Sequence, residues 1–188
     1  MKLLPLALAV ALLGGCASAP PPIAAEMART PAGQITVVEF VDFECVFCRR
    51  AHLAISTVIA RHATQVRLAR KQVPLTRRHP HAADAARAAV CAEELGKGDA
   101  MADALFRATD LTPQGIETLA TGLGMEVGAL HTCLASSETT LRIKQDRADF
   151  DAIEGDGVPI VFVGAERLDG VPDEAAFEAA IVRALDSR

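Results

Sequence analysis

Two cysteines separated by two residues carry the strongest chemical signal in this sequence. Cys45 and Cys48 follow directly on the β-branched and aromatic stretch Ile35–Phe43, and apolar residues with helical spacing come after them. A buried strand that runs into a Cys-x-x-Cys at the start of a helix is typical of a redox active site. In the first turn of a helix the two sulfurs share one face, so they are close enough to form a small disulfide ring.

The predicted helix start favours a reactive thiolate on the first cysteine. Backbone N–H groups in the first turn have no intrahelical acceptor, and the helix dipole is positive there. Both effects stabilise negative charge, so the pKa of Cys45 is predicted to lie below the ~8.5 of a free thiol. We expect Cys45 to be the nucleophile and Cys48 to resolve the mixed disulfide. The alternatives are a structural disulfide or half of a zinc site, but zinc requires two more ligands at comparable spacing.

The N-terminus has the pattern of an export signal. Lys2 precedes the apolar stretch Leu3–Leu13, which is too short to span a bilayer. Leu13-Gly14-Gly15-Cys16 resembles a bacterial lipobox, in which Cys16 would become the lipidated first residue of the mature protein. Cleavage after Ala17-Ser18-Ala19 by an ordinary signal peptidase is the alternative. Both alternatives predict a periplasmic protein, and with a lipid anchor the sorting rule for Ala17 favours the outer membrane.

Composition indicates one globular domain behind a tether. The chain has 188 residues, of which 51% are apolar, and its formal net charge of −5 without a basic run gives no support to nucleic-acid binding. We expect residues 1–15 to form the signal peptide and residues 34–188 the domain. Residues 16–33 are expected to be the lipid anchor and an extended tether, because a Pro- and Ala-rich segment cannot build a core.

The predicted order of elements is strand, helix, strand, several helices, two strands and a helix. The strands are predicted at residues 35–43, 66–73, 158–163 and 165–168. The helices are predicted at residues 46–62, 81–95, 99–109, 113–122, 126–135, 137–153 and 172–185. No strand pattern occurs between residues 80 and 151, so a helical insertion at about residues 77–151 separates the second strand from the third.

Four blocks of residues occur together with this order of elements. They are Val38–Cys48, His79–Ala82, Cys91–Lys97 and Gly157–Phe162. In this order they resemble the DsbA-like family of exported thiol–disulfide oxidoreductases in the thioredoxin superfamily, over residues 34–188. The resemblance implies an α/β thioredoxin fold with a helical insertion between the second and third core strands.

The resemblance also implies an activity. We expect an oxidase that exchanges disulfides with exported proteins containing cysteine pairs, acts as a monomer without cofactor or metal, and is recycled by a membrane redox partner. The alternatives are a periplasmic reductase and a non-catalytic binding protein on a thioredoxin scaffold. The sequence departs from the family at Val46, where proline is usual, and Val158 before Pro159 resembles the oxidase branch rather than the isomerases.

Three further site residues follow from the resemblance. Pro159 is expected to be a cis proline facing the cysteines, and the backbone of Val158 to pair with the substrate chain as an added strand. Glu39 is expected to be a buried acid that assists proton transfer at Cys48, with Arg70 or Lys71 as its partner. The alternatives are a trans proline that opens a strand and a glutamate at a partly solvated sheet edge.

Cys91 and Cys133 are the pair that remains in an oxidising compartment once Cys45 and Cys48 are paired. Each occupies an apolar position of a predicted helix. We favour a structural disulfide that staples two helices over a second, electron-relaying redox pair. Two buried free thiols are the third alternative.

The histidines do not form a convincing metal site. His79 and His81 flank a proline in a pattern typical of a helix start, and His131 is isolated. His52 lies about two turns along the predicted active-site helix, so we expect it to influence the thiolate only weakly.

Overall fold

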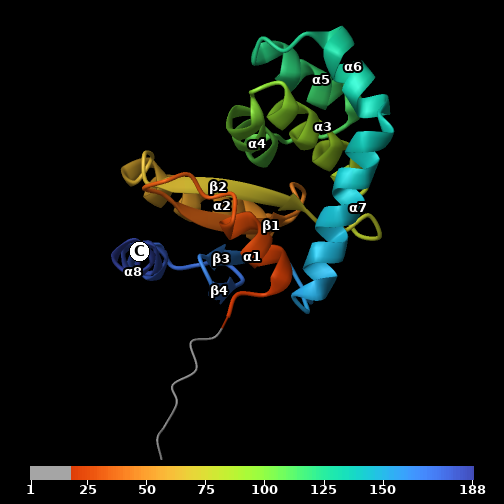
Figure 1. Cartoon of the computed structure of the whole chain (residues 1–188). Coiled ribbons are helices and arrows are strands. Elements are labelled where there is room, and N and C mark those ends of the chain that lie inside the picture. The colour runs from red at the N-terminus through yellow and green to blue at the C-terminus, as the bar shows by residue number, and fades with distance from the viewer. Residues whose placement is uncertain (1–17) are drawn as a thin grey trace, which may run out of the picture.

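The computed structural model describes residues 18–188. The predicted signal peptide and the lipidation residue Cys16 lie outside the described residues. At the centre is a four-stranded sheet in the order β2-β1-β3-β4 (Figure 1). The strands are β1 Ile35–Val41, β2 Val66–Gln72, β3 Ile160–Val163 and β4 Glu166–Asp169. β1 runs parallel to β2 and antiparallel to β3, which in turn runs antiparallel to β4.

Helices cover both faces of this sheet. On one face, α2 Val46–Arg61 and α8 Glu174–Asp186 pack against alternate residues of β1. On the other face lie α1 Pro21–Met27 and α7 Ser137–Ala152, and the Phe40 ring of β1 lies 5.8 Å from the Phe150 ring of α7. β1 is therefore buried along its whole length, which explains why its sequence is almost continuously apolar.

Most of the helical insertion forms a group of helices to one side of the sheet, and its last helix extends back along the sheet (Figure 1). It consists of α3 Ala82–Glu94, α4 Gly98–Arg107, α5 Pro113–Gly122, α6 Val127–Ala135 and α7. Thr112 caps α5 by accepting a hydrogen bond from the N–H of Gly115, as its position before a proline suggests. The α/β thioredoxin fold with a helical insertion between the second and third core strands is confirmed.

The expectation of an extended tether over residues 16–33 is wrong for Pro21–Met27. Pro21–Met27 forms α1, and its Ile23 is fully buried in the core on the α7 face of the sheet. Such a short helix is not stable by propensity, so tertiary contacts must hold it. One buried isoleucine and the buried Glu26 provide these contacts, and neither stands out in a Pro- and Ala-rich composition.

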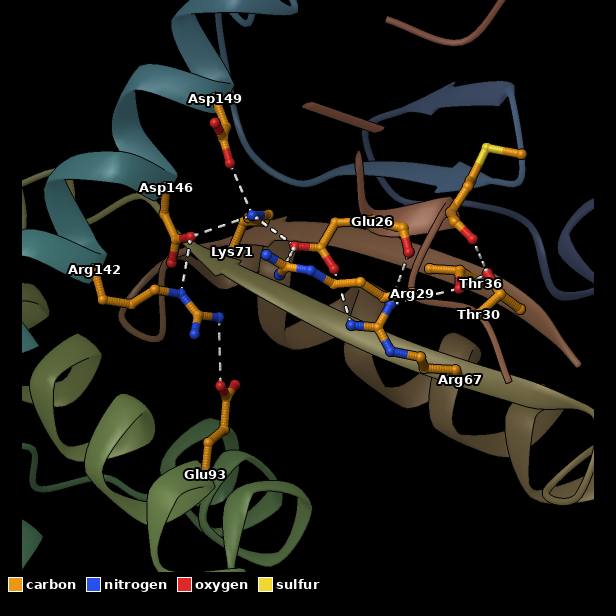
Figure 2. A network of polar contacts seen from close by, with 11 residues as sticks. Glu26, Arg29, Thr30, Thr36, Arg67, Lys71, Glu93, Arg142, Asp146 and Asp149 are labelled. Carbon is orange, nitrogen blue, oxygen red and sulfur yellow. Dashed lines mark hydrogen bonds and ion pairs between the residues drawn. The ribbon is translucent and has the colours of Figure 1, made fainter. Parts of the chain in front are cut away.

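A buried network of charges attaches α1 to the rest of the domain (Figure 2). The Lys71 ammonium of β2 lies 2.9 Å from Glu26 of α1, 2.8 Å from Asp149 and 3.6 Å from Asp146, both of α7. Arg67 also contacts Glu26, at 2.9 Å. Three elements that are distant in sequence thus meet around one lysine.

Cys91 of α3 and Cys133 of α6 form a disulfide with a sequence separation of 42 residues. The disulfide therefore joins two helices of the insertion, as expected for a staple. Removing a disulfide relaxes a constraint on the unfolded chain, and this typically costs about 2–4 kcal/mol of stability.

The Cys91→Ser/Cys133→Ser variant is therefore expected to lower the free energy of unfolding by about 2–4 kcal/mol. Urea unfolding monitored by circular dichroism measures this loss. Disulfide exchange by the folded variant should continue, since neither residue belongs to the Cys45–Cys48 pair. Loss of exchange with little change in stability would instead favour the electron-relay alternative.

Candidate active site

Cys45 and Cys48 lie where β1 leads into α2. Cys45 is the N-cap residue of α2, and Cys48 lies in its first turn. Both are free thiols, and Cys45 is 7% exposed whereas Cys48 is fully buried. The Cys45 thiol points to the carbonyl oxygen of Val158 at 3.7 Å, and the N–H of Asp42 points to the Cys48 sulfur at 3.5 Å. Only the first cysteine therefore borders the surface.

The two thiols differ strongly in acidity. The pKa of Cys45 is lowered to about 6, chiefly because the Cys48 thiol donates a hydrogen bond to its sulfur. The backbone N–H groups of Cys48 and Phe47 lower the pKa of Cys45 further. The Cys45 side chain nevertheless forms no N-cap hydrogen bond with α2. The hydrogen bond between the two thiols, together with burial, raises the pKa of Cys48 far above its ordinary value. The predicted direction of the Cys45 shift is confirmed, but its main cause is the second cysteine rather than the helix terminus.

The rate at which iodoacetamide alkylates the reduced protein should be proportional to the fraction of Cys45 present as thiolate. Since the thiolate is the nucleophile, the rate is expected to rise with pH, to be half-maximal near pH 6 and to level off above pH 7. Mass spectrometry should find the label on Cys45, whereas the buried Cys48 stays unlabelled. A half-maximal rate near pH 8.5, the value of a free thiol, would contradict the assigned stabilisation.

The loop before β3 completes the surroundings of Cys45. The Val158–Pro159 peptide bond is cis, as expected. The carbonyl of Val158 faces the Cys45 sulfur, and the carbonyl of Pro159 accepts a hydrogen bond from Gly170 at 3.0 Å. The structure therefore brings the Cys-x-x-Cys and the proline loop together across 113 residues of sequence.

Glu39 is fully buried in β1, and the sheet register identifies its partner. Glu39 lies opposite Arg70 in the parallel β1–β2 pair, and the Arg70 Nε lies 3.3 Å from the Glu39 carboxylate. The contact lacks hydrogen-bond geometry, and within residues 18–188 neither carboxylate oxygen accepts a hydrogen bond. Burial therefore outweighs Arg70 and raises the pKa of Glu39. Lys71, the other candidate, belongs to the charge network on the opposite face.

Asp42 is a further residue of the site that no motif in the sequence singles out. It is buried three residues before Cys45, and its carboxylate accepts hydrogen bonds from the N–H groups of Glu44 and Leu75 at 2.8 and 2.7 Å. His79 contacts the same carboxylate at 2.9 Å. Asp42 thus fixes the loop that follows β2 against the loop that carries Cys45. The only feature of the sequence that could have identified Asp42 is its position as an acidic residue between an apolar stretch and the cysteines.

His52 is also more integrated than its sequence position suggests. It is buried on α2, lies 3.1 Å from the Asp103 carboxylate of α4 and stacks on the Phe106 ring at 4.6 Å. It therefore joins the active-site helix to the insertion. Among the described residues, no group of three or more His, Cys, Asp or Glu side chains is arranged to hold a metal ion. In residues 18–188, no helix is both long and apolar enough to cross a membrane.

Two grooves adjoin the Val158 loop. The larger has a volume of about 460 Å³ and includes Cys45 in its lining. The smaller, of about 210 Å³, lies along Pro159 and the end of β4. Phe47 lines both grooves and is 54% exposed, and its neighbour Val46 is 59% exposed. Exposed apolar side chains next to a nucleophile can bind an apolar part of a substrate chain.

Solved structures share this arrangement of elements. A thioredoxin-like oxidoreductase from Silicibacter pomeroyi DSS-3 is 28% identical and superposes with a TM-score of 0.74, covering 84% of this chain and 90% of that chain. The thiol-disulfide exchange protein alpha-DsbA2 from Wolbachia pipientis is 14% identical, with a TM-score of 0.73 and coverage of 82% and 83%. A periplasmic thioredoxin-like protein from Salmonella enterica serovar Typhimurium is 18% identical, with a TM-score of 0.71 and coverage of 88% and 97%.

Sequence relatives include much longer proteins. A Na(+)/H(+) antiporter, NhaA 3 of Salinispora tropica, is 34% identical over 154 residues, which are 81% of this chain and 24% of the antiporter. The chain thus spans about a quarter of the length of the curated relatives it matches, and ion transport is not attributed to it. A family model described as thioredoxin matches residues 30–183, from the turn before β1 into α8. This match includes the whole sheet, the Cys-x-x-Cys and the cis-proline loop, and the chain therefore belongs to the thioredoxin family.

Proposed function

We propose that this protein is an exported thiol–disulfide oxidoreductase that oxidises cysteine pairs of envelope proteins through Cys45 and Cys48. The observation that carries the proposal is the difference between the two thiols. Cys45 borders a groove and has a pKa lowered to about 6, whereas Cys48 is buried behind it with a raised pKa. Cysteines with a purely structural role are inert, whereas a lowered pKa and access to the surface are typical of a reactive thiol.

The reaction follows the chemistry of disulfide exchange. A substrate thiolate attacks the Cys45 sulfur of the oxidised pair, a substrate–Cys45 disulfide forms, and the Cys45–Cys48 bond breaks. Cys48 leaves with the electron pair of that bond and takes up a proton. A second substrate thiolate then attacks the substrate sulfur and releases Cys45 as a thiolate. Two electrons pass from the substrate dithiol to the protein, and a membrane redox partner would remove them again.

Glu39 is proposed as the proton source for Cys48. A thiol with a raised pKa is a poor leaving group as a thiolate, so a nearby acid assists its departure. The Glu39 charge contributes to the raised pKa of Cys48, and the pKa of Glu39 is itself raised by burial. Glu39 therefore retains its proton at a higher pH than an exposed glutamate does.

Glu39→Gln is accordingly expected to slow the opening of the Cys45–Cys48 disulfide by roughly 10- to 100-fold, because the amide cannot donate an acidic proton. Stopped-flow measurements with a dithiol peptide test this expectation across a pH series. The pH profile for alkylation of Cys45 should change much less, since that reaction does not involve Cys48. Equal opening rates in a correctly folded variant would remove Glu39 from the mechanism.

The direction of electron flow is tested by the reduction potential of the pair. A Cys45 pKa of about 6 instead of 9 stabilises the reduced form and raises the potential by about 30 mV at pH 7. Equilibration with glutathione measures the value directly. A potential near ~−120 mV supports the oxidase, whereas one near ~−270 mV, that of thioredoxin, would identify a reductase. A pair that cannot be reduced would favour the non-catalytic scaffold.

The proposed location is the periplasm, with a lipid anchor at Cys16. The apolar segment and lipobox-like residues at the N-terminus support it, and the Salmonella neighbour is named as periplasmic. An oxidising compartment also suits the Cys91–Cys133 disulfide. The protein would act there as a monomer on exported proteins.

A further inference from the structure

The two grooves that meet at Phe47 and Val158 differ in charge. The larger groove is lined by Arg77 and Arg78 from the loop after β2 and by Arg147 of α7, and Asp156 is the single acidic residue in its lining. The smaller groove is lined by Asp156 and Asp169 and contains no basic residue in its lining. A substrate chain at Cys45 therefore meets positive charge on one side and negative charge on the other.

The arginines of the larger groove are available to a ligand. Arg77 and Arg78 are exposed, and within the described part of the chain their side chains form no ion pair. Arg147 pairs with the exposed Asp151 at 3.0 Å, and its guanidinium lies over the Phe150 ring at 5.4 Å from the ring centroid. This contrasts with the many buried or paired arginines elsewhere and with the overall net charge of −5. The positive groove is thus a local feature next to the nucleophile.

We propose that this groove selects polypeptide substrates that carry an acidic side chain on one side of the reacting cysteine. The inference rests on the proposed function. A substrate that extends past Val158 would place side chains in the larger groove, where Leu75 and Val46 provide an apolar wall beside the arginines. The preferred sequence therefore combines an acidic and an apolar residue on that side.

The charge difference between the grooves makes the expected preference one-sided. On the larger side, a carboxylate gains from two unpaired guanidinium groups. On the smaller side the same carboxylate meets Asp156 and Asp169 and gains nothing. A uniform effect of the protein's net negative charge would disfavour an acidic residue on both sides, so the two explanations make different predictions.

The test uses three dithiol peptides that differ at two positions. One has Gln on both sides of the reacting cysteine, and each of the others has Glu in place of one Gln. The rate constant for reducing the oxidised full-length protein is measured for each peptide. It is divided by the rate constant of the same peptide with a small neutral disulfide, because a nearby carboxylate changes the thiol pKa of the peptide itself.

Glu on the side that enters the larger groove is expected to raise this ratio about three- to tenfold over Gln. Glu on the side that enters the smaller groove should not raise the ratio. The gain should shrink at high ionic strength. In Arg77→Gln/Arg78→Gln, the ratio for the Glu peptide should fall towards that of the Gln peptide. Arg50→Gln, which removes an exposed arginine of α2 outside both grooves, is the matched control and should retain the gain.

Equal ratios for all three peptides with an active protein would overturn the inference and leave the proposed function intact. A gain that survives in Arg77→Gln/Arg78→Gln would overturn it as well. If no peptide reduces the protein, the proposed function fails and the inference fails with it.

Discussion

Cys45→Ser is expected to reduce disulfide exchange to the rate measured without protein. Cys48→Ser is expected to form the mixed disulfide between Cys45 and the substrate but not to resolve it. A serine at position 45 cannot form a disulfide with the substrate, and Cys48 is fully buried, so it cannot replace the missing nucleophile. In Cys48→Ser the Cys45 thiol stays accessible and forms a mixed disulfide that no internal thiol can resolve. The mixed species should then accumulate.

Non-reducing gels and mass spectrometry distinguish these outcomes after incubation with a disulfide-containing peptide. Cys48→Ser should carry one peptide on Cys45, and Cys45→Ser should carry none. The Cys91→Ser/Cys133→Ser variant is the control, because it replaces two cysteines and leaves Cys45 and Cys48 unchanged. Exchange by Cys45→Ser at the wild-type rate would disprove the proposed nucleophile.

A third variant separates the two causes of the Cys45 thiolate. A serine at position 48 still offers a hydroxyl that can donate to the Cys45 sulfur, whereas an alanine offers nothing. Since the Cys48 hydrogen bond is the largest cause of the lowered pKa, the alkylation midpoint should shift to higher pH in Cys48→Ala and less in Cys48→Ser. Equal midpoints in all three proteins would assign the stabilisation to the helix N-terminus alone.

The fold and the cysteine pair could be predicted because their signals are local. The mostly apolar, β-branched and aromatic stretch at residues 35–43 predicted β1, and the Cys-x-x-Cys after it predicted the start of α2. The helix predicted at residues 113–122 is α5, which spans Pro113–Gly122. Each of these signals depends on neighbouring residues, so a single sequence contains all the information that is needed.

The missed features depend on contacts between distant residues. Arg70 rather than Lys71 faces Glu39 because of the β1–β2 register, which no local pattern specifies. α1 forms because Ile23 and Glu26 find partners in the folded domain. The charge of each groove likewise comes from loops that only the fold brings together.

Lys71→Met is expected to lower the free energy of unfolding by about 3–5 kcal/mol, because it removes one partner from a buried ion-pair cluster. The Lys71 side chain is 7% exposed and contacts three carboxylates, on Glu26, Asp146 and Asp149. The methionine fills much of the same volume, so the loss reports charge rather than a cavity. Lys144→Met, an exposed lysine of α7, is the matched control and should change stability by less than about 0.5 kcal/mol.

The pH dependence of this loss shows whether charge causes it. Burial alone would raise the pKa of Glu26, but hydrogen bonds from Arg67 and Lys71 outweigh burial and lower it. A carboxylate with a lowered pKa contributes stability above its unfolded-state pKa and loses that contribution as the pH falls through its folded-state value. The wild type should therefore lose this contribution in acid, and the difference from Lys71→Met should narrow below about pH 4. Urea unfolding at neutral and acid pH measures both values. A difference that stays constant with pH would mean that Lys71 acts through packing, and that the charge network does not hold α1 to the sheet.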